Sequence, residues 1–450
     1  MKRLILAHIN EWYNDPNRKP LLLCGARQVG KTYLIRNQFA KQFRDHVYID
    51  LIKDDESRGF FSNTCDPQKY LEYIEARFNK KITPDCPLIM DEVQECPNAI
   101  VSLKYFCQDY RELPVIATGS LVRLAINRMK KKKEFSFPVG KVNVMNMYPM
   151  TYEEYLLNAN PPLLERIRES FSTHRPMDNA FHEMALDRLY EYLAIGGMPE
   201  ALGCFISTGS YVETGKVIAD VYGNYLADMS MYNVSDETIL KTRNVYENIF
   251  RQLNKENKNF KIGQIEHGKS NRDYFNAYMW LELARVIYRS RKTDGHIPLP
   301  LTEEEEGLFR YYLADEGMFV HQSRLPRSDF LVKDKRNALS GIFYENYVAD
   351  ELRAKGIKLF YWVGKGANEI EFVVQNGSYA VPIDVKKSSG KMSSLEAFRA
   401  NNPRYTAVKI SSGNYGYDSE RDLLSIPLYQ TFLLAEQLSR GESIRPEERS

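Results

Sequence analysis

The sequence predicts an α/β fold that begins with a parallel β-sheet. Three short apolar runs, at residues 21–23, 87–90 and 114–117, support this prediction, and each is followed by glycine or polar residues. Continuous apolar runs of this length are typical of strands that are buried on both faces of a parallel sheet. Because parallel strands end along one edge of their sheet, we expect the residues after these runs to form a ligand site.

The first run leads directly into a glycine-rich loop. Residues 25–32 read GARQVGKT, which fits the spacing G-x-x-x-x-G-K-[ST], and a helix is expected from residue 32 to residue 39. A strand that turns into a helix in this way directs backbone N–H groups and the positive end of the helix dipole toward one anion. Lys31 is expected to contact the β- and γ-phosphates of ATP, and Thr32 to ligate Mg²⁺. The predicted nucleotide-binding residues are Gly25, Ala26, Arg27, Gln28, Val29, Gly30, Lys31, Thr32 and Tyr33.

The second and third runs supply acidic and hydroxyl side chains at the same edge. Asp91 follows the second run, and we expect it to hold Mg²⁺ through water while Glu92 polarises the attacking water. Thr118 and Ser120 follow the third run, where their hydroxyl groups could sense the γ-phosphate, although these residues are also typical of a simple turn. The predicted catalytic residues of the nucleotide site are Lys31, Glu92 and Ser120.

The length and composition of the chain bound its organisation. At 450 residues the chain is too long for one ordinary domain, and we predict three regions, at residues 1–150, 151–310 and 311–450. The 61 basic and 59 acidic residues nearly balance, so the composition gives no global sign of nucleic-acid binding. Six cysteines without C-x-x-C spacing predict reduced thiols in a cytoplasmic protein, and no apolar stretch is long enough to predict a membrane span.

The mostly helical middle region has the outline of a winged helix. Short helical pieces lead into an apolar-periodic helix at residues 274–283 and then into a β-rich segment at residues 286–288. An ordinary helical connector has the same pattern, and both interpretations remain open. The lysine-rich segment at residues 128–134 is typical of a solvated loop, with contact to phosphate groups as the alternative.

The third region contains a predicted β-hairpin with an Asn376-Gly377 turn. This turn would place Glu369 opposite Asp384, and side-chain alternation would then group four residues on one face of the sheet: Glu369, Glu371, Asp384 and Lys386. Carboxylates suit Mg²⁺ or Mn²⁺, so we predict Glu371 and Asp384 as metal ligands. Lys386 is expected to position or activate water for attack on a phosphodiester.

One further carboxylate is expected at this second site. In the predicted helix at residues 341–352, Glu345 interrupts an apolar stripe formed by Ile342, Ala349 and Leu352. A carboxylate in such a position is either paired or functional. The predicted catalytic residues of the second site are Glu345, Glu371, Asp384 and Lys386. The alternative for the whole group is a solvated sheet face with salt bridges.

The order of the motifs is similar to that in a large family of prokaryotic ATPases. The shared segments are GARQVGKT, LIMDEVQECP, VIATGS, YLAIGGMPE, YYLADEGM, GIFYENYVADEL, NEIEFVV and VPIDVKKS. Those proteins join an AAA-type P-loop domain to a C-terminal domain of unknown function, DUF4143. The resemblance covers nearly the whole chain and implies a P-loop core related to AAA+ and STAND ATPases. It also implies a winged-helix-like middle and a C-terminal α/β fold similar to PD-(D/E)xK nucleases.

The resemblance also implies roles for single residues. Asp91 and Glu92 would be the Walker B pair, and Ser120 would belong to the sensor strand. Residues 197–199 resemble the GxP signature that lies near the nucleotide in STAND proteins, which adds Pro199 to the nucleotide-binding residues. The four predicted catalytic residues of the second site match the nuclease-like positions. Glu371 departs from the family pattern, which usually has aspartate there.

Two functions are compatible with these patterns. The first is an ATP- and Mg²⁺-binding P-loop ATPase whose nucleotide state controls a nuclease-like, DNA-interacting C-terminal domain. The second is a nucleotide-dependent regulatory switch or protein-interaction module in which the nuclease-like domain is catalytically inactive. Both allow an oligomer that depends on nucleotide, and contacts with DNA are expected through the C-terminal and winged-helix-like regions. Neither function involves a membrane.

Overall fold

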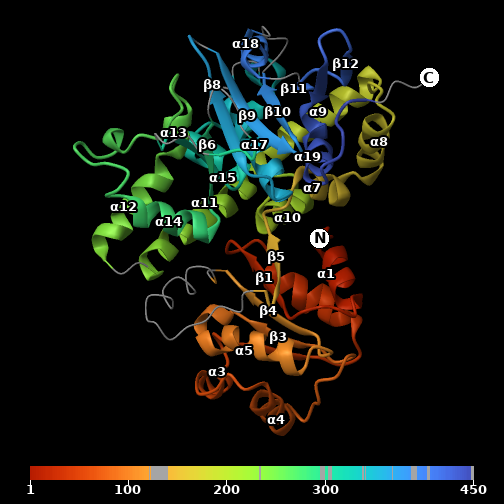
Figure 1. The fold of residues 1–450 in the computed structure, drawn as a ribbon, viewed down its shortest axis with the longest axis vertical. Helices are drawn as coiled ribbons and strands as arrows, with labels where there is room; N and C mark the ends of the chain where they lie inside the picture. Colours follow the sequence, from red (N-terminus) through yellow and green to blue (C-terminus); the bar gives the residue numbers. More distant parts are fainter. Residues whose placement is uncertain are drawn as a thin grey trace. The chain divides into compact units, whose positions relative to one another are not determined.

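The structure is a computed structural model that describes residues 1–120, 122, 140–232, 235–293, 299–302, 307–336, 339, 341–366, 368–386, 393–402 and 406–446. The chain forms two compact units (Figure 1). The P-loop unit comprises Lys2–Tyr148 and Leu283–Arg285, and the C-terminal unit comprises Met1, Pro149–Glu282 and Val286–Ser450. The lysine-rich segment at residues 128–134 lies outside the described residues. No helix within the described ranges has both the length and the apolar character that crossing a membrane would require.

A five-stranded sheet forms the centre of the P-loop unit. Its strands lie in the order β2-β3-β4-β1-β5, and each neighbouring pair is parallel. The strands are β1 (Leu21–Gly25), β2 (Val47–Asp50), β3 (Leu88–Asp91), β4 (Val115–Gly119) and β5 (Asn143–Met147). The three apolar runs form β1, β3 and β4, so the parallel sheet predicted from the sequence is confirmed.

Helices flank this sheet, and two of them begin at side-chain caps. They are α1 (Ile5–Asn14), α2 (Lys31–Leu34), the π-helical η1 (Ile35–Phe39), η2 (Ala40–Gln42), α3 (Asp55–Ser62), α4 (Pro67–Phe78), η3 (Val93–Glu95) and α5 (Pro97–Asp109). The Asp54 and Asp66 side chains accept hydrogen bonds from the first turns of α3 and α4, which satisfies N–H groups that a helix leaves free. Apolar side chains of α3, α4 and α5 pack on one face of the sheet.

An eight-stranded sheet forms the centre of the C-terminal unit, in the order β12-β13-β11-β10-β9-β8-β6-β7. Its strands are β6 (Ile287–Lys292), β7 (Phe309–Leu313), β8 (Leu359–Val363), β9 (Glu369–Asn376), β10 (Tyr379–Val385), β11 (Ala407–Ser411), β12 (Gly416–Asp418) and β13 (Leu423–Pro427). The β6–β8, β10–β11 and β11–β13 pairs are parallel, and the others are antiparallel. The chain as a whole is therefore a mixed α/β protein.

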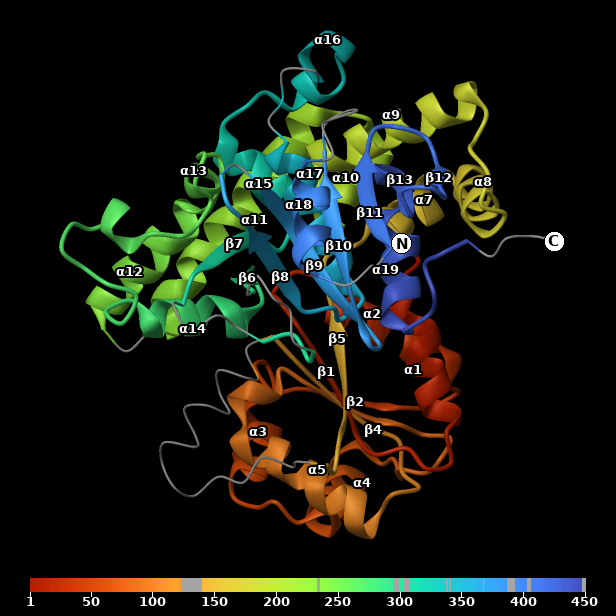
Figure 2. The same ribbon diagram turned by 45° about the horizontal axis from the view of Figure 1, so that its top comes forward.

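Helices of the C-terminal unit precede and surround this sheet. They are α7 (Tyr152–Ala159), α8 (Pro161–Ser172), α9 (Asn179–Ile195), α10 (Pro199–Thr208), α11 (Tyr211–Tyr232), α12 (Asp236–Glu247), α13 (Ile249–Leu253), η4 (Ile262–Gln264), α14 (Phe275–Ala284), α15 (Glu316–Ser323), η5 (Arg327–Phe330), α16 (Lys333–Arg336), α17 (Ile342–Ala354), α18 (Ser393–Asn401), η6 (Leu428–Gln430) and α19 (Thr431–Ser439). Figure 2 shows α18 in front of the sheet, where Leu395 and Phe398 pack against Trp362 and Ile370. This packing buries one apolar side of β8 and β9.

The predicted β9–β10 hairpin is present, but its predicted register is wrong by two residues. Tyr379 pairs with Asn376, which puts Gly377 and Ser378 in the turn and leaves Asn376 at the end of the strand. Gly377 has a φ of 58°, a conformation that glycine adopts without strain. The β8–β9 register also shifts between Phe360 and Trp362, so strict side-chain alternation does not hold along β9.

The described residues of the middle region do not form a sheet of their own. The helix and strand predicted at residues 274–288 are present as α14 and β6, but β6 and β7 both join the large C-terminal sheet. The boundary predicted after residue 310 therefore falls inside β7. The boundary was placed there because the pattern before it is mostly helical, and the pairing of β6 with β8 is not visible in local sequence.

Two adjacent glycines permit a close backbone approach within the C-terminal unit. Gly197 donates a hydrogen bond to Asp315 (N···Oδ2 2.7 Å), and its carbonyl accepts one from the Met150 N–H (2.7 Å). A Cβ atom at Gly197 would lie 2.0 Å from the Met150 carbonyl oxygen, and one at Gly196 would lie 2.3 Å from the Gly317 nitrogen. Gly196 also has a φ of 74°. Side chains are thus excluded where the start of α10 meets the start of α15.

Buried carboxyl groups in this unit make its stability depend on pH. Burial raises the pKa of Glu351 to about 8, and the hydrogen bond from the Tyr152 N–H opposes the shift. Between pH 4.5 and about 8, the Glu351 carboxyl group is protonated in the folded chain but ionised in the unfolded chain. The free energy of unfolding therefore falls as the pH rises through this range.

We therefore expect Glu351→Gln, which keeps an acceptor for Tyr152, to be more stable than the wild type at pH 8 and to differ less from it at pH 6. Chemical denaturation at the two pH values should show a change in this difference of about 1 to 3 kcal/mol. An equal difference at both pH values would contradict the assignment of the proton to Glu351.

Candidate nucleotide site and C-terminal charge cluster

The glycine-rich loop follows β1 and ends at the first residue of α2. Gln28 and Gly30 have positive φ angles of 61° and 91°, which turn the chain back toward the sheet. Gly25 must lack a side chain because a Cβ atom there would lie 2.4 Å from the Met147 carbonyl oxygen on β5. Lys31 is buried at the start of α2, and its ammonium group donates to the carbonyl oxygens of Gly25 (3.1 Å) and Ala26 (2.7 Å). The loop thus folds around the Lys31 ammonium group.

The Lys31 ammonium lies in an environment that favours its neutral form. Burial lowers the pKa of Lys31 to about 8, and the nearby Glu92 and Asp91 carboxylates oppose the shift. Its hydrogen-bond acceptors in the loop are neutral carbonyl groups, so part of its charge is uncompensated there. A polyphosphate placed at the loop would supply the missing negative charge.

Asp91 is the centre of a hydroxyl network at the carboxyl end of β3. Its Oδ2 atom accepts hydrogen bonds from the Thr32 (2.8 Å) and Tyr48 (2.7 Å) hydroxyl groups, and Oδ1 accepts one from Thr118. The predicted Mg²⁺ residues Thr32 and Asp91 are therefore in direct contact. The Thr118 hydroxyl contacts Asp91, which was not part of its predicted role.

Glu92 and Ser120 lie at the next positions along the same edge. Glu92 has a φ of 56°, and its Oε2 atom accepts a hydrogen bond of 2.5 Å from Gln94 Nε2. A Cβ atom at Gly119 would lie 2.4 Å from Gln94 Oε1, so the Gln94 side chain lies close against the end of β4. Ser120 is buried, and its Oγ atom has no hydrogen-bond partner. These groups retain hydrogen-bonding capacity for a ligand at this edge.

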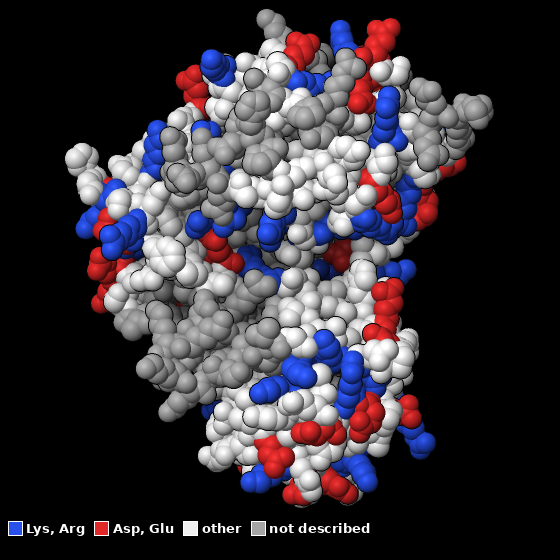
Figure 3. Space-filling view, viewed as in Figure 1, with Lys and Arg blue, Asp and Glu red and all other residues white. Residues whose placement is uncertain are grey.

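Two residues of this site were missed in the sequence. Tyr48 lies on β2, whose alternating pattern gave no functional signal, and burial raises the pKa of its hydroxyl above the usual value. Gln94 follows the acidic pair by two residues and was not assigned a role. Tyr33 is 55% exposed. The prediction that it contacts nucleotide rests on its position directly after the loop. On the face of the P-loop unit in Figure 3, charges of both signs are interspersed.

The C-terminal unit brings the predicted residues of the second site together. The Lys386 ammonium lies 2.7 Å from Asp384 Oδ1 and 3.7 Å from Glu371 Oε1. Glu371 also accepts a hydrogen bond from the Val385 N–H (3.1 Å), which fixes it beside β10. Glu345, on α17, is joined to Glu371 through a shared contact with Lys258. The side chains from α17, β9 and β10 therefore form one cluster.

Two cations in this cluster were not anticipated. Lys258 Nζ contacts Glu345 Oε1, lies 2.9 Å from Glu369 Oε1 and lies 3.9 Å from Glu371 Oε1. Arg310 is 1% exposed and donates to Glu369 (2.9 Å), and its guanidinium lies 3.8 Å from the centre of the Tyr361 ring. We call these residues with Glu345, Glu369, Glu371, Asp384 and Lys386 the C-terminal charge cluster.

Burial and charge shift the pKa values within the C-terminal charge cluster. Burial raises the pKa of Glu371 to about 7, against the opposing charge of Lys258 and with a further increase from Asp384. Burial likewise raises the pKa of Glu345, although Lys258 opposes the shift. Glu369 is different, because Arg310 and Lys258 outweigh its burial and lower its pKa. Across the described ranges, no group of three or more His, Cys, Asp or Glu side chains is arranged to hold a metal ion.

Family comparisons agree with the order of motifs along the chain. A family model described as an AAA domain matches residues 17–156, and two domains of unknown function, DUF8612 and DUF4143, match residues 186–329 and 340–429. The chain thus combines an AAA-type domain with a C-terminal DUF4143 domain. The DUF4143 match contains Glu345, Glu371, Asp384 and Lys386, whereas Lys258 and Arg310 lie in the DUF8612 match.

Two solved structures resemble this AAA-type protein at low identity. The Walker-type ATPase PABY2304 of Pyrococcus abyssi is 14% identical, with a TM-score of 0.43, over 72% of this chain and 95% of that one. The Aeropyrum pernix ORC2 protein, solved as ADPNP–ADP complexes, is 12% identical, with a TM-score of 0.33, over 73% of this chain and 92% of that one. No curated protein sequence matches the chain.

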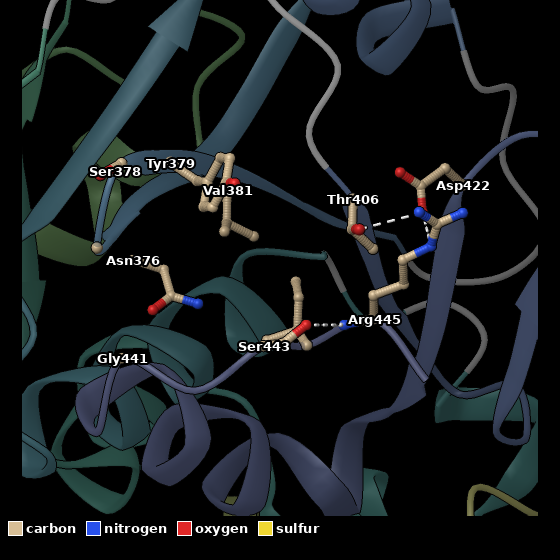
Figure 4. Close-up of a pocket in the computed structure, with 11 residues that line it drawn as sticks. Asn376, Ser378, Tyr379, Val381, Thr406, Asp422, Gly441, Ser443 and Arg445 are labelled. Carbon is tan, nitrogen blue, oxygen red and sulfur yellow. Dashed lines mark hydrogen bonds and ion pairs between the residues drawn. The ribbon is translucent and has the colours of Figure 1, made fainter. Parts of the chain in front are cut away.

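Two further features of the C-terminal unit, a pocket and Pro199, are not part of the C-terminal charge cluster. A pocket of about 380 Å³ opens beside the β9–β10 turn and is lined by residues such as Asn376, Thr406 and Arg445 (Figure 4). Its described lining contains none of the predicted site residues. Pro199 is the first residue of α10, in the C-terminal unit.

Proposed function

We propose that this chain binds and hydrolyses ATP with Mg²⁺, and that its nucleotide state controls a nuclease-like C-terminal domain that contacts DNA. The observation that carries the ATPase proposal is the hydroxyl network of Asp91 with Thr32, beside the buried Lys31. Oxygen donors and a cation at the carboxyl edge of a parallel sheet fit Mg²⁺ and a triphosphate. Bound Mg²⁺·ATP would supply a polarised γ-phosphate for attack by water.

Each residue at this edge has a proposed task. Lys31 and the loop N–H groups bind phosphate oxygens, and Thr32 and Asp91 hold the metal. Glu92 orients the attacking water and accepts its proton, and Ser120 uses its unpartnered hydroxyl group to contact the γ-phosphate. We also propose that Pro199 approaches the nucleotide, that the middle region acts like a winged helix, and that nucleotide controls oligomer formation.

The C-terminal charge cluster supports the proposed nuclease-like domain. A helix carboxylate, two strand carboxylates and a lysine, in Glu345, Glu371, Asp384 and Lys386, form a donor set suited to a metal ion and to positioning water. Contact with DNA would follow from phosphate groups approaching Lys386, whose side chain is the most exposed of the basic members.

A second candidate function is favoured by one observation. Lys258 and Arg310 already neutralise carboxylates of the C-terminal charge cluster. In this candidate function the C-terminal domain is catalytically inactive, and the chain is a nucleotide-dependent switch that acts through a protein partner or an oligomer.

The first test uses Glu92→Gln in the full chain. Because Gln cannot accept the proton of the attacking water, turnover should fall by about 100-fold or more while ATP affinity changes little. Steady-state phosphate release and titration with a fluorescent ATP analogue separate the two effects. Full turnover by the folded variant would remove Glu92 from the proposed site.

A DNA-binding and cleavage experiment decides between the two candidate functions. Wild-type protein, Asp384→Ala and Lys386→Ala are mixed with labelled duplex DNA at low salt, with Mn²⁺ and with or without ATP. DNA binding that weakens steeply with salt supports the first function, and cleavage that both substitutions abolish makes the domain a nuclease. Absence of DNA binding, together with ATP hydrolysis, would favour the switch.

A further inference from the structure

The C-terminal charge cluster holds a cation that comes from a distant part of the chain. Lys258 lies between α13 and η4, 87 residues before Glu345 and 111 residues before Glu369 in the sequence. Its ammonium group is within hydrogen-bonding distance of Glu345 and Glu369 and 3.9 Å from Glu371. The side chain is 16% exposed, so this contact is largely shielded from water. One ammonium group therefore lies among three carboxyl groups.

The loop that carries Lys258 is fastened on both sides. Gln252 donates to the Lys261 carbonyl oxygen (3.3 Å) and accepts from the Lys261 N–H (2.7 Å), which closes the base of the loop. Next to Lys258, Asn259 accepts a hydrogen bond from the Tyr361 hydroxyl (2.6 Å), and the Phe260 N–H donates to the Phe309 carbonyl on β7 (2.9 Å). Lys258 is therefore held in place before any ligand arrives.

The carboxyl groups around Lys258 retain unused acceptor capacity. Glu345 is 4% exposed, and its Oε2 atom is buried without a hydrogen-bond partner. Asp384 is fully buried, and Lys386, at 2.7 Å from its Oδ1 atom, is its ion-pair partner. Unpartnered carboxylate oxygens cost free energy in a buried site, and a doubly charged ion would satisfy them better than one ammonium group.

We propose that the Lys258 ammonium stands in for a divalent cation, so that the wild-type chain keeps Mg²⁺ and Mn²⁺ out of the C-terminal charge cluster. Removal of this ammonium group would leave Glu345, Glu371 and Asp384 with an excess of negative charge and room for a metal ion. The proposal deepens the proposed function, because it rests on a nuclease-like cluster and adds the residue that regulates it. It also explains why the described carboxylates do not converge as a metal site.

The test is Mn²⁺ binding to the full chain carrying Lys258→Met. Electron paramagnetic resonance of free Mn²⁺ counts bound ions without any nuclease assay, and Asp91→Asn in every sample removes the proposed metal ligand of the nucleotide site. We expect Lys258→Met to bind one Mn²⁺ in the C-terminal charge cluster at least about tenfold more tightly than the matched parent does. Addition of Mn²⁺ should also raise the melting temperature of this variant. Lys255→Met, on the same loop but outside the cluster, should behave like the parent.

Two results would overturn the proposal. One is a parent protein that binds Mn²⁺ as tightly as Lys258→Met with loss of that binding in Glu371→Gln, which would mean that Lys258 does not exclude the ion. The other is a folded Lys258→Met that gains no Mn²⁺ site. If Lys258→Met does not fold, Lys258→Gln, whose amide can still donate to Glu345, replaces it and must show the same gain. Failure of ATP turnover or of DNA binding would instead contradict the proposed function and leave these binding results unchanged.

Discussion

Replacement of Lys31 by alanine is expected to weaken ATP binding by on the order of 100-fold or more. The Lys31 ammonium is buried beside the loop, and its acceptors there are the neutral carbonyl oxygens of Gly25 and Ala26. Most of its electrostatic interaction is therefore available to a phosphate group in a site with little water. Titration with a fluorescent ATP analogue in the presence of Mg²⁺ measures the loss.

A surface lysine of the same unit provides the control. Lys41 is exposed on η2, and Lys41→Ala should bind ATP like the wild type. Circular dichroism and thermal melting of both variants show whether the fold is retained. If folded Lys31→Ala bound ATP with wild-type affinity, the loop would not be the phosphate site.

The second large effect is expected from Gly197→Ala, which should destabilise the C-terminal unit by about 2 to 4 kcal/mol. The added Cβ atom would lie 2.0 Å from the Met150 carbonyl oxygen, so one of the two backbones must move. Such a movement would strain the hydrogen bonds that Gly197 makes with Asp315 and Met150. Denaturant unfolding followed by tryptophan fluorescence measures the difference.

Gly223→Ala is a matched control for which we expect a change in stability of the opposite sign. Gly223 is exposed in the interior of α11, and a Cβ atom there would meet no atom within 4 Å apart from its chain neighbours and the backbone of its own helix. Alanine should therefore stabilise the helix by up to about 1 kcal/mol. A wild-type unfolding curve for Gly197→Ala would mean that the backbone contact between Gly197 and Met150 yields easily.

The P-loop unit could be predicted because its signals are local. The glycine spacing of residues 25–32 and the apolar runs before Asp91 and Thr118 each fit within a few residues, and parallel strands bring their ends together by geometry alone. Tyr48 was not predictable in this way, because its contact with Asp91 depends on β2 lying next to β3. A tyrosine on an alternating strand has no local sign of such a role.

The C-terminal unit was predictable only in part, because its contacts join distant segments. The hairpin and its carboxylates were visible in sequence, but Asn376-Gly377 suggested a turn two residues out of register, and the turn contains Gly377 and Ser378 instead. Lys258 and Arg310 reach the carboxylates from α13's loop and from β7, and no spacing rule connects residues so far apart. Their positions in the C-terminal charge cluster could be known only once the strand order of the sheet was known.

The strand order of the large sheet also sets when each unit can form during synthesis. All five strands of the P-loop sheet lie within the first 147 residues, so this sheet can assemble while the rest of the chain is still on the ribosome. In the C-terminal sheet, β6 pairs with β8, and β11 pairs with β13, which ends at Pro427. The C-terminal sheet therefore cannot be completed until almost the entire polypeptide has emerged, whereas the P-loop sheet can be complete much earlier.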